Sequence, residues 1–443
     1  MQIESTPAST EPRAPDGTPV TSIRVLYPDL HGIARGKDVP ISEFDHVIEK
    51  GLCFCAAVMG TDLRHTPVVG GEAGYPDLVA RPDMETMITL PWEPGVAQCI
   101  ADLSPAEGGA PIPDPRGAVR RAVANLEELG YAPIVGPELE FFLLERDADG
   151  RVKRRVDHLS MVYTVGPQAD PGGLVRQMTE HLAQVGLEVF AVNHEFMNSQ
   201  YEINLRHSDA LKAADRAFRL KTAVKDIAAQ KGLMATFMGK PFNDQGGSGT
   251  HLHISLIREG RNVFGSEDGL EHELPAFVAG VLHHAHALMA FLNPTINAYR
   301  RIVPDSLAPT HANWGWDNRA SFIRIPPERG GATRIEIRVG DGAANPYLAI
   351  AAVLAAGTHG IRAGLTPPPP VTGDAYRAAA DVIGAALPRS LDEALDALAA
   401  DDVLMTALGP EIVEPFVAVK RFEADRHRAW VSDWDLDEYL HHL

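Results

Sequence analysis

The spacing of apolar and polar residues divides the chain into two parts. Residues 22–39 alternate apolar and polar positions around a turn at residues 28–32, which predicts a β-hairpin. Glycines and prolines interrupt the pattern after the hairpin, and a helical apolar stripe begins at Pro115. We therefore expect a small β-rich domain over residues 20–112 and a second domain over residues 113–443.

The second domain alternates strand-like with helix-like patterns. The strand-like runs cover residues 132–144, 188–205, 234–238, 251–256, 321–325 and 334–339. The helical runs cover residues 115–129, 173–184, 208–231, 273–292 and 345–360, and the chain after the polyproline segment 367–370 also reads as helical. This alternation is typical of an α/β domain, so the predicted fold class of the whole chain is α+β.

Composition narrows the range of partners. The 443 residues include 40 Lys and Arg against 59 Asp and Glu, and this net charge of -19 disfavours nucleic acid and anionic membranes. Three cysteines cannot form a closed disulfide framework, and no apolar run reaches the roughly 20 residues of a membrane span. Residues 1–19 have no signal-peptide pattern and are expected to be a disordered tail. We expect a cytoplasmic protein with no nucleic-acid and no membrane partner.

Two pairs of glutamates indicate a cation site. Glu138 and Glu140 stand two residues apart in a strand pattern, so their side chains leave the same face. Carboxylates ~5 Å apart repel by ~3 kcal/mol at an effective dielectric constant of about 20, which favours a bound cation. Glu195 and Glu202 flank an Asn-Ser bend that would return both to one place. An exposed polar strand and an ordinary loop are the structural alternatives.

A glycine-rich loop, residues 246–249, runs into another polar strand face. His251, His253 and Ser255 share that face, with apolar residues on the opposite one. Glycines allow the backbone to approach a ligand closely. The combination favours a binding site over structural histidines.

An arginine cluster accompanies these motifs. Residues 300–338 contain seven arginines and no lysine, and Arg334, Glu336 and Arg338 share one strand face. Planar guanidinium groups bind phosphate or carboxylate through paired hydrogen bonds, which favours an anion site over a surface ion-pair network. With the five glutamates and His251, the pattern fits Mg²⁺ or Mn²⁺ holding a nucleotide triphosphate. No Walker loop or kinase signature is present, so the nucleotide must be held in another way.

The motifs, taken in order, resemble those of the glutamine synthetase family. They are GPELEFF at residues 136–142, HEFMNSQYE at 194–202, GSGTHLH at 247–253, NPTINAYRRIVP at 293–304, DNR at 317–319, IRIP at 323–326, RIEIR at 334–338 and AANPY at 343–347. The resemblance covers residues 20–443 and implies a β-grasp first domain and a catalytic α/β second domain. It also implies a homo-oligomer, a dodecamer of two hexameric rings, in which neighbouring subunits share each active site.

The resemblance assigns roles to individual residues. It places Glu140, Glu195 and Glu202 on a metal beside the glutamate substrate, and Glu138, His251 and Glu336 on a metal at the nucleotide phosphates. It places Gly247, Arg301 and Arg338 at the glutamate, Arg319, Arg324 and Arg334 near phosphate, and His253 and Ser255 near ATP. The implied catalytic residues are Arg301, Arg319 and Arg338. The implied chemistry is phosphorylation of the glutamate γ-carboxylate by ATP, followed by attack of an amine.

Both carboxylates of the family's ammonium site are missing. Leu307 stands where the family's flexible loop has a glutamate, and residues 54–58, which match the Phe-Asp-Gly-Ser-Ser motif, contain no acid. Asp62 is the nearest acid that could replace one of them. Gly246 replaces the first asparagine of the family's Asn-Gly-Ser-Gly motif, which leaves the identity of the acid substrate open.

We therefore predict an ATP-dependent ligase that joins the γ-carboxylate of glutamate to an organic amine, with Leu307 at the substrate. The amine classes are polyamines, ethanolamine-like amines, alkylamines and arylamines, because an apolar pocket suits the body of a larger amine. Two alternatives remain at this point: an ordinary glutamine synthetase that uses ammonium, and a non-catalytic relative. The complete set of metal-ligand residues argues against the second.

Two further groups are expected to be structural. Cys53 and Cys55 share a strand face, and core packing is favoured over metal binding or contact with the amine. His283, His284 and His286 lie in an apolar helical pattern and are expected to pack or face solvent instead of binding a second metal.

Overall fold

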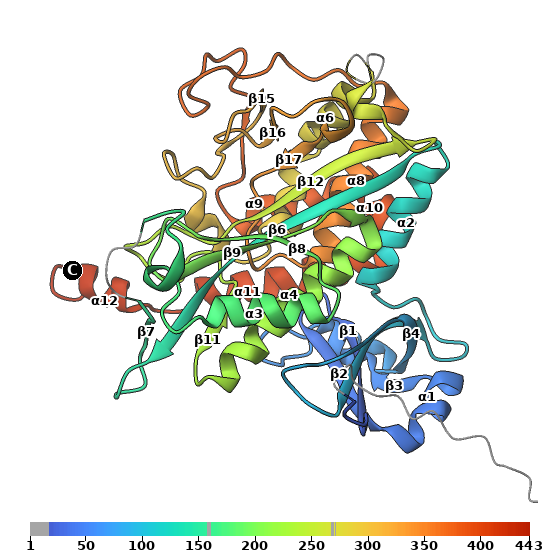
Figure 1. Ribbon diagram of the computed structural model, residues 1–443. Helices are drawn as coiled ribbons and strands as arrows, with labels where there is room; N and C mark the ends of the chain where they lie inside the picture. Colours follow the sequence, from blue (N-terminus) through green and yellow to red (C-terminus); the bar gives the residue numbers. More distant parts are fainter. Residues whose placement is uncertain (1–16, 157–160, 267–269, 271) are drawn as a thin grey trace, which may run out of the picture.

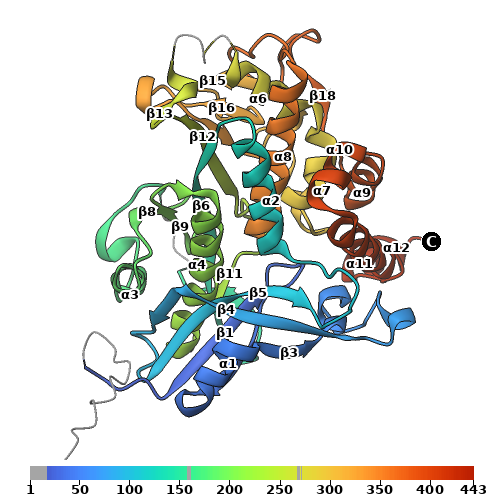
Figure 2. The same cartoon turned by 90° about the vertical axis from the view of Figure 1, so that its right-hand side faces the viewer.

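The N-terminal part of the chain forms a five-stranded sheet. The computed structural model describes residues 17–156, 161–266, 270 and 272–443. The strand order is β2-β1-β5-β4-β3, and the strands are β1 (Ser22–Pro28), β2 (Ala34–Pro40), β3 (Leu52–Cys55), β4 (Asp77–Thr89) and β5 (Val96–Pro105). β1 and β2 pair antiparallel from Ser22 opposite Pro40 to Pro28 opposite Ala34, which confirms the predicted hairpin. Figure 2 shows this sheet, with α1 (Phe44–Lys50), below the rest of the chain.

The structure corrects the prediction for Cys53 and Cys55. Both thiols are exposed, while Leu52 and Phe54 on the other face of β3 pack against the domain core. The Phe54 ring lies 4.9 Å from the ring of Tyr27. The domain core covers one face of β3, and the cysteines lie on the other face, which is open to solvent.

The second part of the chain is built around an eleven-stranded sheet. Its main path is β15-β16-β17-β12-β6-β9-β8, with β7, β10 and β11 on β6 and β13 on β12. The strands are β6 (Ala132–Arg146), β7 (Val152–Arg154), β8 (Val189–His194), β9 (Gln200–Leu205), β10 (Ser208–Asp209), β11 (Met234–Thr236), β12 (Thr250–Arg258), β13 (Arg261–Asn262), β15 (Trp314–Trp316), β16 (Ile323–Ile325) and β17 (Ile335–Ile337). β14 (His311–Ala312) and β18 (Ala385–Ala386) form a separate pair.

Helices cover one face of this sheet, as Figure 1 shows. The helices of this part of the chain are α2 (Pro115–Glu127), α3 (Leu174–Gln184), α4 (Ala210–Gln230), α6 (Glu273–His283), α7 (Ala285–Leu292), α8 (Pro346–Ala363), α9 (Leu391–Ala399), α10 (Asp402–Leu408), α11 (Pro410–Arg428) and α12 (Asp433–Tyr439), of which α12 projects away from the sheet. The apolar side chains of β12 and β17, such as Ile254 and Ile337, join the core that contains α6, α7 and α8. The polar side chains of the same strands therefore lie on the other face.

The predicted helix over residues 273–292 is two helices. α6 and α7 meet at His284 with a bend of 74°. The His284 ring hydrogen-bonds through Nδ1 to Asp401 Oδ2 at 2.5 Å and through Nε2 to His359 Nδ1 at 2.9 Å. This bent pair meets the length and composition of a membrane span, but no single helix does among the residues described. The cytoplasmic location stays a prediction.

The prediction of helices throughout residues 371–443 is wrong for its first part. Only β18 interrupts irregular backbone over residues 371–390, and the helices begin with α9. Val371 N donates to Trp314 O at 2.8 Å and Asn313 Nδ2 donates to Ile383 O at 2.8 Å, so this segment is fixed by contacts to β15 and its neighbours. Such long-range contacts leave no periodic signal in the sequence.

One buried arginine joins the first sheet to the helices that follow it. Arg116 on α2 is 1% exposed and donates to Asp215 Oδ2 on α4 at 2.8 Å. It also donates to Asp83 Oδ2 at 2.7 Å and to Asp102 Oδ1 at 2.5 Å, on β4 and β5. We propose the domain boundary at residue 112, between β5 and α2, and this ion-pair cluster would then fasten the two domains together. Most of the predicted tail, residues 1–16, lies outside the described residues.

Candidate active site

Neighbouring strands bring Glu138, His251 and Glu336 together. Glu138 on β6 stands opposite His251 on β12, and Glu336 on β17 stands opposite His253, also on β12. His251 Nδ1 lies 3.3 Å from Glu138 Oε2 and 3.8 Å from Glu336 Oε1. One ligand atom of each of the three lies within 4.8 Å of the other two. The structure therefore makes neighbours of three residues that the sequence analysis assigned to one metal.

Glu140, Glu195 and Glu202 form a second group. Glu140 and Glu202 are directly opposite in the pairing of β6 with β9, and Glu195 follows β8. One oxygen of each lies within 4.8 Å of the others. Glu140 Oε2 accepts hydrogen bonds from Gly249 N at 2.8 Å and from Gln200 Nε2 at 2.9 Å, which fixes this carboxylate.

The three carboxylates of the second group are close together, and neighbouring positive groups do not compensate their negative charge. Burial raises the pKa of Glu195 to about 7, and the nearby Glu140 carboxylate adds to this effect. Burial likewise raises the pKa of Glu202 to about 9, with further contributions from Glu138 and Glu140. Crowded carboxylates of this kind favour a bound cation.

In the first group, hydrogen bonds and a neighbouring arginine outweigh the effect of burial on the carboxylate pKa values. Burial opposes ionisation of Glu138, but hydrogen bonds from His251 and His253 hold its pKa well below the usual range. Burial opposes ionisation of Glu336 as well, but Arg338 and the two histidines lower its pKa to about 2. Both carboxylates are therefore ionised and available to a metal at neutral pH.

Both groups fit a hard divalent cation. One offers three carboxylates and the other offers two carboxylates and an imidazole, with ligand atoms close enough to meet on a single ion. Mg²⁺ and Mn²⁺ accept such oxygen-rich sets and leave coordination positions for water or phosphate. The residues present thus suit the metals that the sequence analysis predicted.

Arg324 and Arg338 hold Glu336 from two sides. Arg324 Nη1 donates to Glu336 Oε2 at 2.6 Å, and Arg338 Nη1 donates to Glu336 Oε1. Arg338 Nε also donates to Arg319 O at 2.8 Å. The Arg319 side chain is exposed, and among the described residues its guanidinium has no ion pair with these carboxylates.

The glycine-rich loop is shaped around Arg301. A Cβ on Gly247 would lie 2.5 Å from Arg301 Cγ. A Cβ on Gly249 would lie 3.2 Å from both Arg301 Nη2 and Glu140 Oε1. A Cβ would overlap Arg301 at position 247 and would crowd the ends of two side chains at position 249, so glycine allows the close approach at both positions. It places the Arg301 guanidinium beside the second carboxylate group.

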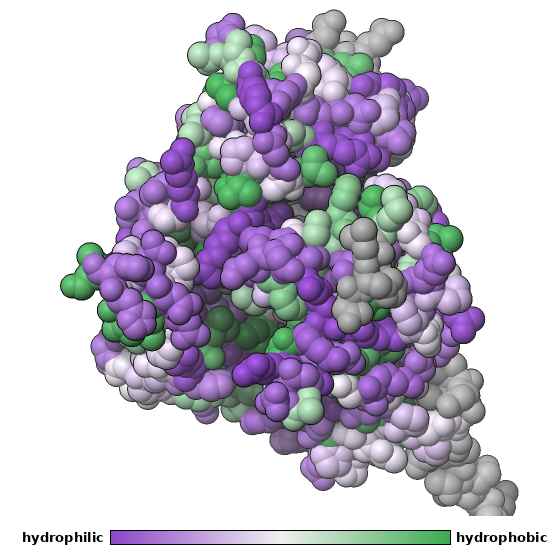
Figure 3. All heavy atoms as spheres, turned by 90° about the vertical axis from the view of Figure 1, so that its left-hand side faces the viewer, coloured by the Kyte–Doolittle hydropathy of each residue, from purple (hydrophilic) through white to green (hydrophobic). Residues whose placement is uncertain are grey.

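A cavity of about 550 Å³ opens beside the first carboxylate group. Its walls include Glu138 together with His253, Ser255 and Arg334, three of the residues expected near ATP. Arg334 Nε donates to His253 Nδ1 at 3.1 Å. The other two residues expected near phosphate, Arg319 and Arg324, do not line this cavity. Figure 3 shows the hollowed face on the left-hand side of Figure 1, where hydrophilic residues surround hydrophobic ones.

Leu307 lies in an exposed loop. Its side chain is 44% exposed and its backbone has a φ of +58°. The loop is tied down on either side of Leu307, because Asp305 pairs with Arg377 at 2.8 Å and Ala308 O accepts a hydrogen bond from Tyr376 Oη at 3.1 Å. The Leu307 side chain presents an apolar surface to solvent, and its place in an amine pocket stays a prediction.

Asp62 and Gly246, which the sequence analysis left open, have defined surroundings. Asp62 is fully buried, accepts a hydrogen bond from Arg64 N at 2.9 Å and pairs with Arg426, so its charge is neutralised within its own chain. A Cβ on Gly246 would lie 3.1 Å from Met197 Cε. A larger residue at position 246 would therefore displace Met197.

Two residues of the site were missed in the sequence. Gln200 donates to Glu140 Oε2 and also to Gly247 O at 3.0 Å, so it links the carboxylate group to the glycine-rich loop. It stands two residues before Glu202, and the same period that singled out Glu138 and Glu140 could have found it. Asp341, near Arg301, lies outside any strand and gave no such signal.

Comparison with known proteins identifies the family. The profile described as "Glutamine synthetase, catalytic domain" matches residues 113–439. The chain belongs to the glutamine synthetase family. It is 35% identical to the glutamine synthetase of Halobacterium salinarum over 94% of this chain and 93% of that protein. It is 36% identical to the glutamine synthetase of Thermotoga maritima over 95% and 97%.

Solved structures agree with this family. A chain of the GmaS/ADP complex in conformation 1 matches with a TM-score of 0.85 and 32% identity, over 95% of this chain and 97% of that chain. Apo GmaS without ligand matches with a TM-score of 0.84. The glutamine synthetase fold with mixed α and β content is thereby confirmed. Enzymes of this family are ligases that use ATP and divalent metals such as Mg²⁺ or Mn²⁺, and they are typically oligomeric.

Proposed function

We propose that this ligase joins the γ-carboxylate of glutamate to an organic amine in an ATP-dependent reaction. The observation that carries the proposal is Leu307, an apolar and 44% exposed side chain at the position of a glutamate in the family's ammonium site. The second expected acid, within residues 54–58, is absent too. Loss of negative charge weakens ammonium binding, whereas an apolar surface favours the carbon body of an alkylamine, ethanolamine-like amine, polyamine or arylamine.

The reaction proceeds in two steps. The γ-phosphoryl group of ATP passes to a γ-carboxylate oxygen of glutamate, which yields γ-glutamyl phosphate and ADP. The neutral amine nitrogen then attacks the γ-carbonyl carbon, the amide bond forms, phosphate leaves with the bonding electron pair, and the nitrogen releases one proton to solvent. Divalent cations, when bound by the two carboxylate groups, neutralise phosphoryl charge and orient the phosphate.

The chain's own residues bind and orient the reactants. Arg301 and Arg338 would hold the glutamate, because their guanidinium groups lie beside the two carboxylate groups. His253, Ser255 and Arg334 would bind the nucleotide in the 550 Å³ cavity. Phosphoryl transfer depends mainly on such positioning and on charge neutralisation, so the proposed reaction needs no nucleophilic side chain.

The second candidate is an ordinary glutamine synthetase. The curated relatives from Halobacterium salinarum and Thermotoga maritima carry that name, which favours ammonium as the acceptor. Phosphate release from ATP, with Mg²⁺ and glutamate, separates the two candidates when ammonium is compared with methylamine, ethanolamine, putrescine and aniline. We expect faster turnover with one of the organic amines, and faster turnover with ammonium would establish the second candidate.

We also propose that the chain assembles as a homo-oligomer, a dodecamer of two hexameric rings. The proposal rests on the family, whose enzymes are typically oligomeric. Mass photometry of the full chain would show a single species of twelve subunits. A monomer at the concentrations used in the activity assay would contradict it.

A further inference from the structure

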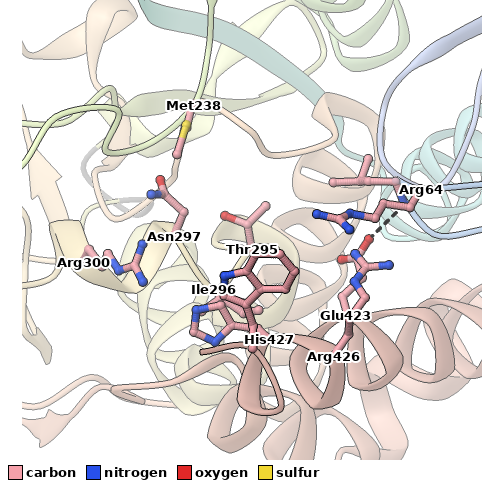
Figure 4. Close-up of a pocket in the computed structure, with 11 residues that line it drawn as sticks. Arg64, Met238, Thr295, Ile296, Asn297, Arg300, Glu423, Arg426 and His427 are labelled. Carbon is pink, nitrogen blue, oxygen red and sulfur yellow. Dashed lines mark hydrogen bonds between the residues drawn. The ribbon is translucent and has the colours of Figure 1, made fainter. Parts of the chain in front are cut away.

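A second cavity, of about 360 Å³, lies apart from the nucleotide cavity, and the two share no lining residue. Three parts of the chain form its walls: residues 63–64 of the N-terminal part, the end of α11 with Trp430, and Met238 with residues 295–300. Figure 4 shows Arg64 and Arg300 on opposite sides of this cavity, with Thr295, Ile296 and His427 between them.

Much of the cavity wall is apolar. Leu63 is 50% exposed, Met238 is 43% exposed and Trp430 is 63% exposed, and all three face the cavity together with Ile296. Single exposed apolar side chains are common on protein surfaces, but several that line one concave site indicate ligand binding. A ligand with an apolar body would remove all of them from water at once.

Two of the charged residues in the wall are already neutralised. Glu423 accepts hydrogen bonds from Lys420 Nζ at 2.9 Å and from Leu63 N at 3.3 Å. Arg426 pairs with the buried Asp62. Neither residue therefore sets the charge of a ligand.

The other two arginines keep their charge available. Among the described residues, neither Arg64 nor Arg300 forms an ion pair with an acid, although the chain as a whole carries a net charge of -19. The Arg64 guanidinium lies 5.7 Å from the centre of the Trp430 ring, an arrangement that leaves its N–H edge free to bind. Uncompensated guanidinium groups at an apolar cavity select an anionic group on an apolar body.

We propose that this cavity is a binding site for a small organic acid with an apolar or aromatic body. Arg300 and Arg64 attract the anionic group from opposite sides of the cavity, so the group binds at one of the two, and Trp430, Leu63 and Met238 contact the body. This site is separate from the site proposed for ATP and glutamate, and the proposal does not depend on the acceptor amine.

The cavity is also connected to the glycine-rich loop. Asn297 Nδ2 donates to Lys240 O at 2.9 Å, and Lys240 N donates to Asn297 Oδ1 at 2.7 Å. These two bonds join the cavity wall to the segment that precedes the glycine-rich loop. Gly239 O then accepts a hydrogen bond from Ser248 N at 2.7 Å. Arg300 lines the cavity and directly precedes Arg301, which is proposed to hold glutamate. A ligand that contacts Arg300 therefore contacts the segment that carries Arg301.

Isothermal titration of the full chain with three acids tests the proposal without requiring turnover. The acids are indole-3-acetate, 3-phenylpropionate and hexanoate, and indole-3-acetamide is the uncharged match for the first. We expect at least one acid to bind, and we expect Arg300→Met and Arg64→Met each to weaken its binding by about tenfold. Arg176→Met is the control, because Arg176 lies on α3 with its side chain 80% exposed.

Hydrogen exchange gives a second readout. The acid that binds should slow exchange of the Lys240 amide and of residues 298–301 in the wild type, and this effect should weaken in Arg300→Met. The proposal is overturned if none of the acids binds, if the amide binds as tightly as the acid, or if both arginine variants bind like the control. Because no turnover is measured, these outcomes leave the proposed ligase reaction untouched.

Discussion

The Asp341 carboxylate lies behind Arg301, with Oδ2 at 3.9 Å from Arg301 Nη1. Asp341 is fully buried, and its Oδ1 accepts a hydrogen bond from Ala343 N at 2.8 Å. A Cβ on Gly239 would overlap this carboxylate, so glycine provides the space for it. At this distance the two groups attract each other without a hydrogen bond, and we expect Asp341 to be a positioning residue that orients the guanidinium proposed to hold glutamate.

Asp341→Asn should raise the KM for glutamate by about tenfold, because the variant removes the charge opposite Arg301 but keeps the volume of the side chain. The KM for ATP should change much less, since the nucleotide cavity does not include this residue. Steady-state kinetics with each substrate varied in turn gives both values. Equal changes in the two KM values would mean that Asp341 only supports the fold.

Stability of the metal-free protein should fall as the pH rises to about 7. The pKa of Glu195 is raised to about 7 and that of Glu202 to about 9, so the folded state retains protons that the unfolded chain has already lost. At these two glutamates the folded state binds more protons, so their contribution to stability decreases from the usual glutamate range up to about pH 9. Burial lowers the pKa of Lys221 to about 7, which acts in the opposite direction above pH 7, so the net fall in stability is expected below about pH 7. Mg²⁺ should raise the melting temperature more at about pH 8 than at about pH 6, because it binds the ionised carboxylates. Thermal unfolding across this range measures the effect, and a constant Mg²⁺ shift would contradict it.

Glu202→Gln should increase the stability of the metal-free protein but reduce its activity. Replacing a crowded carboxylate by a neutral amide should stabilise the metal-free protein by about 1 kcal/mol or more near pH 8. The same change should reduce phosphate release at least about 10²-fold, because it removes a proposed metal ligand. Denaturant unfolding without metal and turnover with Mg²⁺ are the two measurements. A variant that is both less stable and active would show that Glu202 is only a structural residue.

Removing Arg116 should lower the free energy of unfolding, because this arginine joins the first sheet to α4. Arg116→Met leaves the buried Asp215 carboxylate without its cationic partner and with only the hydrogen bond from Tyr347 Oη, and breaking a buried ion pair in this way costs about 3–5 kcal/mol. Arg120→Met is a matched control, because Arg120 lies on the same helix and pairs with Asp102, but its side chain is 40% exposed. The control should lose about 1 kcal/mol or less. Similar losses in both variants would rule out a special role for Arg116.

Sequence periodicity correctly predicts which residues share a face of a single strand. It placed Glu138 with Glu140, and the structure has these glutamates where β6 meets β12 and β9. Pairing between strands far apart in the chain, such as Glu336 opposite His253, came only through the resemblance, because no local pattern encodes it.

The incorrect predictions also arise because contacts between distant segments leave no local pattern in the sequence. Period-two alternation shows that Cys53 and Cys55 share a face but cannot show which face of the strand meets the core, so the core packing predicted for them is wrong. Apolar periodicity continues across residues 273–292, and only the bonds of His284 to Asp401 and His359 mark the bend between the two helices. Sites that depend on several distant segments, such as the cavity around Arg300, gave no signal at all.

Leu307→Glu should shift acceptor preference toward ammonium. The substitution returns one negative charge to an exposed loop and removes an apolar surface, so it favours the small cation over the alkyl or aryl body. We expect the ratio of kcat/KM for ammonium to that for the preferred amine to rise by about tenfold or more. Leu307→Gln, which is polar but uncharged, distinguishes the effect of charge from that of lost apolar contact. Unchanged ratios in both variants would remove the role assigned to Leu307.

The most direct test of the amine-ligase assignment is a competition in one reaction. The full chain receives ATP, Mg²⁺ and glutamate with equal concentrations of ammonium, methylamine, ethanolamine, putrescine and aniline, and mass spectrometry measures the ratio of γ-glutamyl products. All acceptors then compete for the same γ-glutamyl phosphate, so the ratio reports their selection directly. Our account predicts a γ-glutamyl amide of one organic amine in clear excess over glutamine. Glutamine as the main product would contradict it and identify the protein as an ammonium-dependent glutamine synthetase.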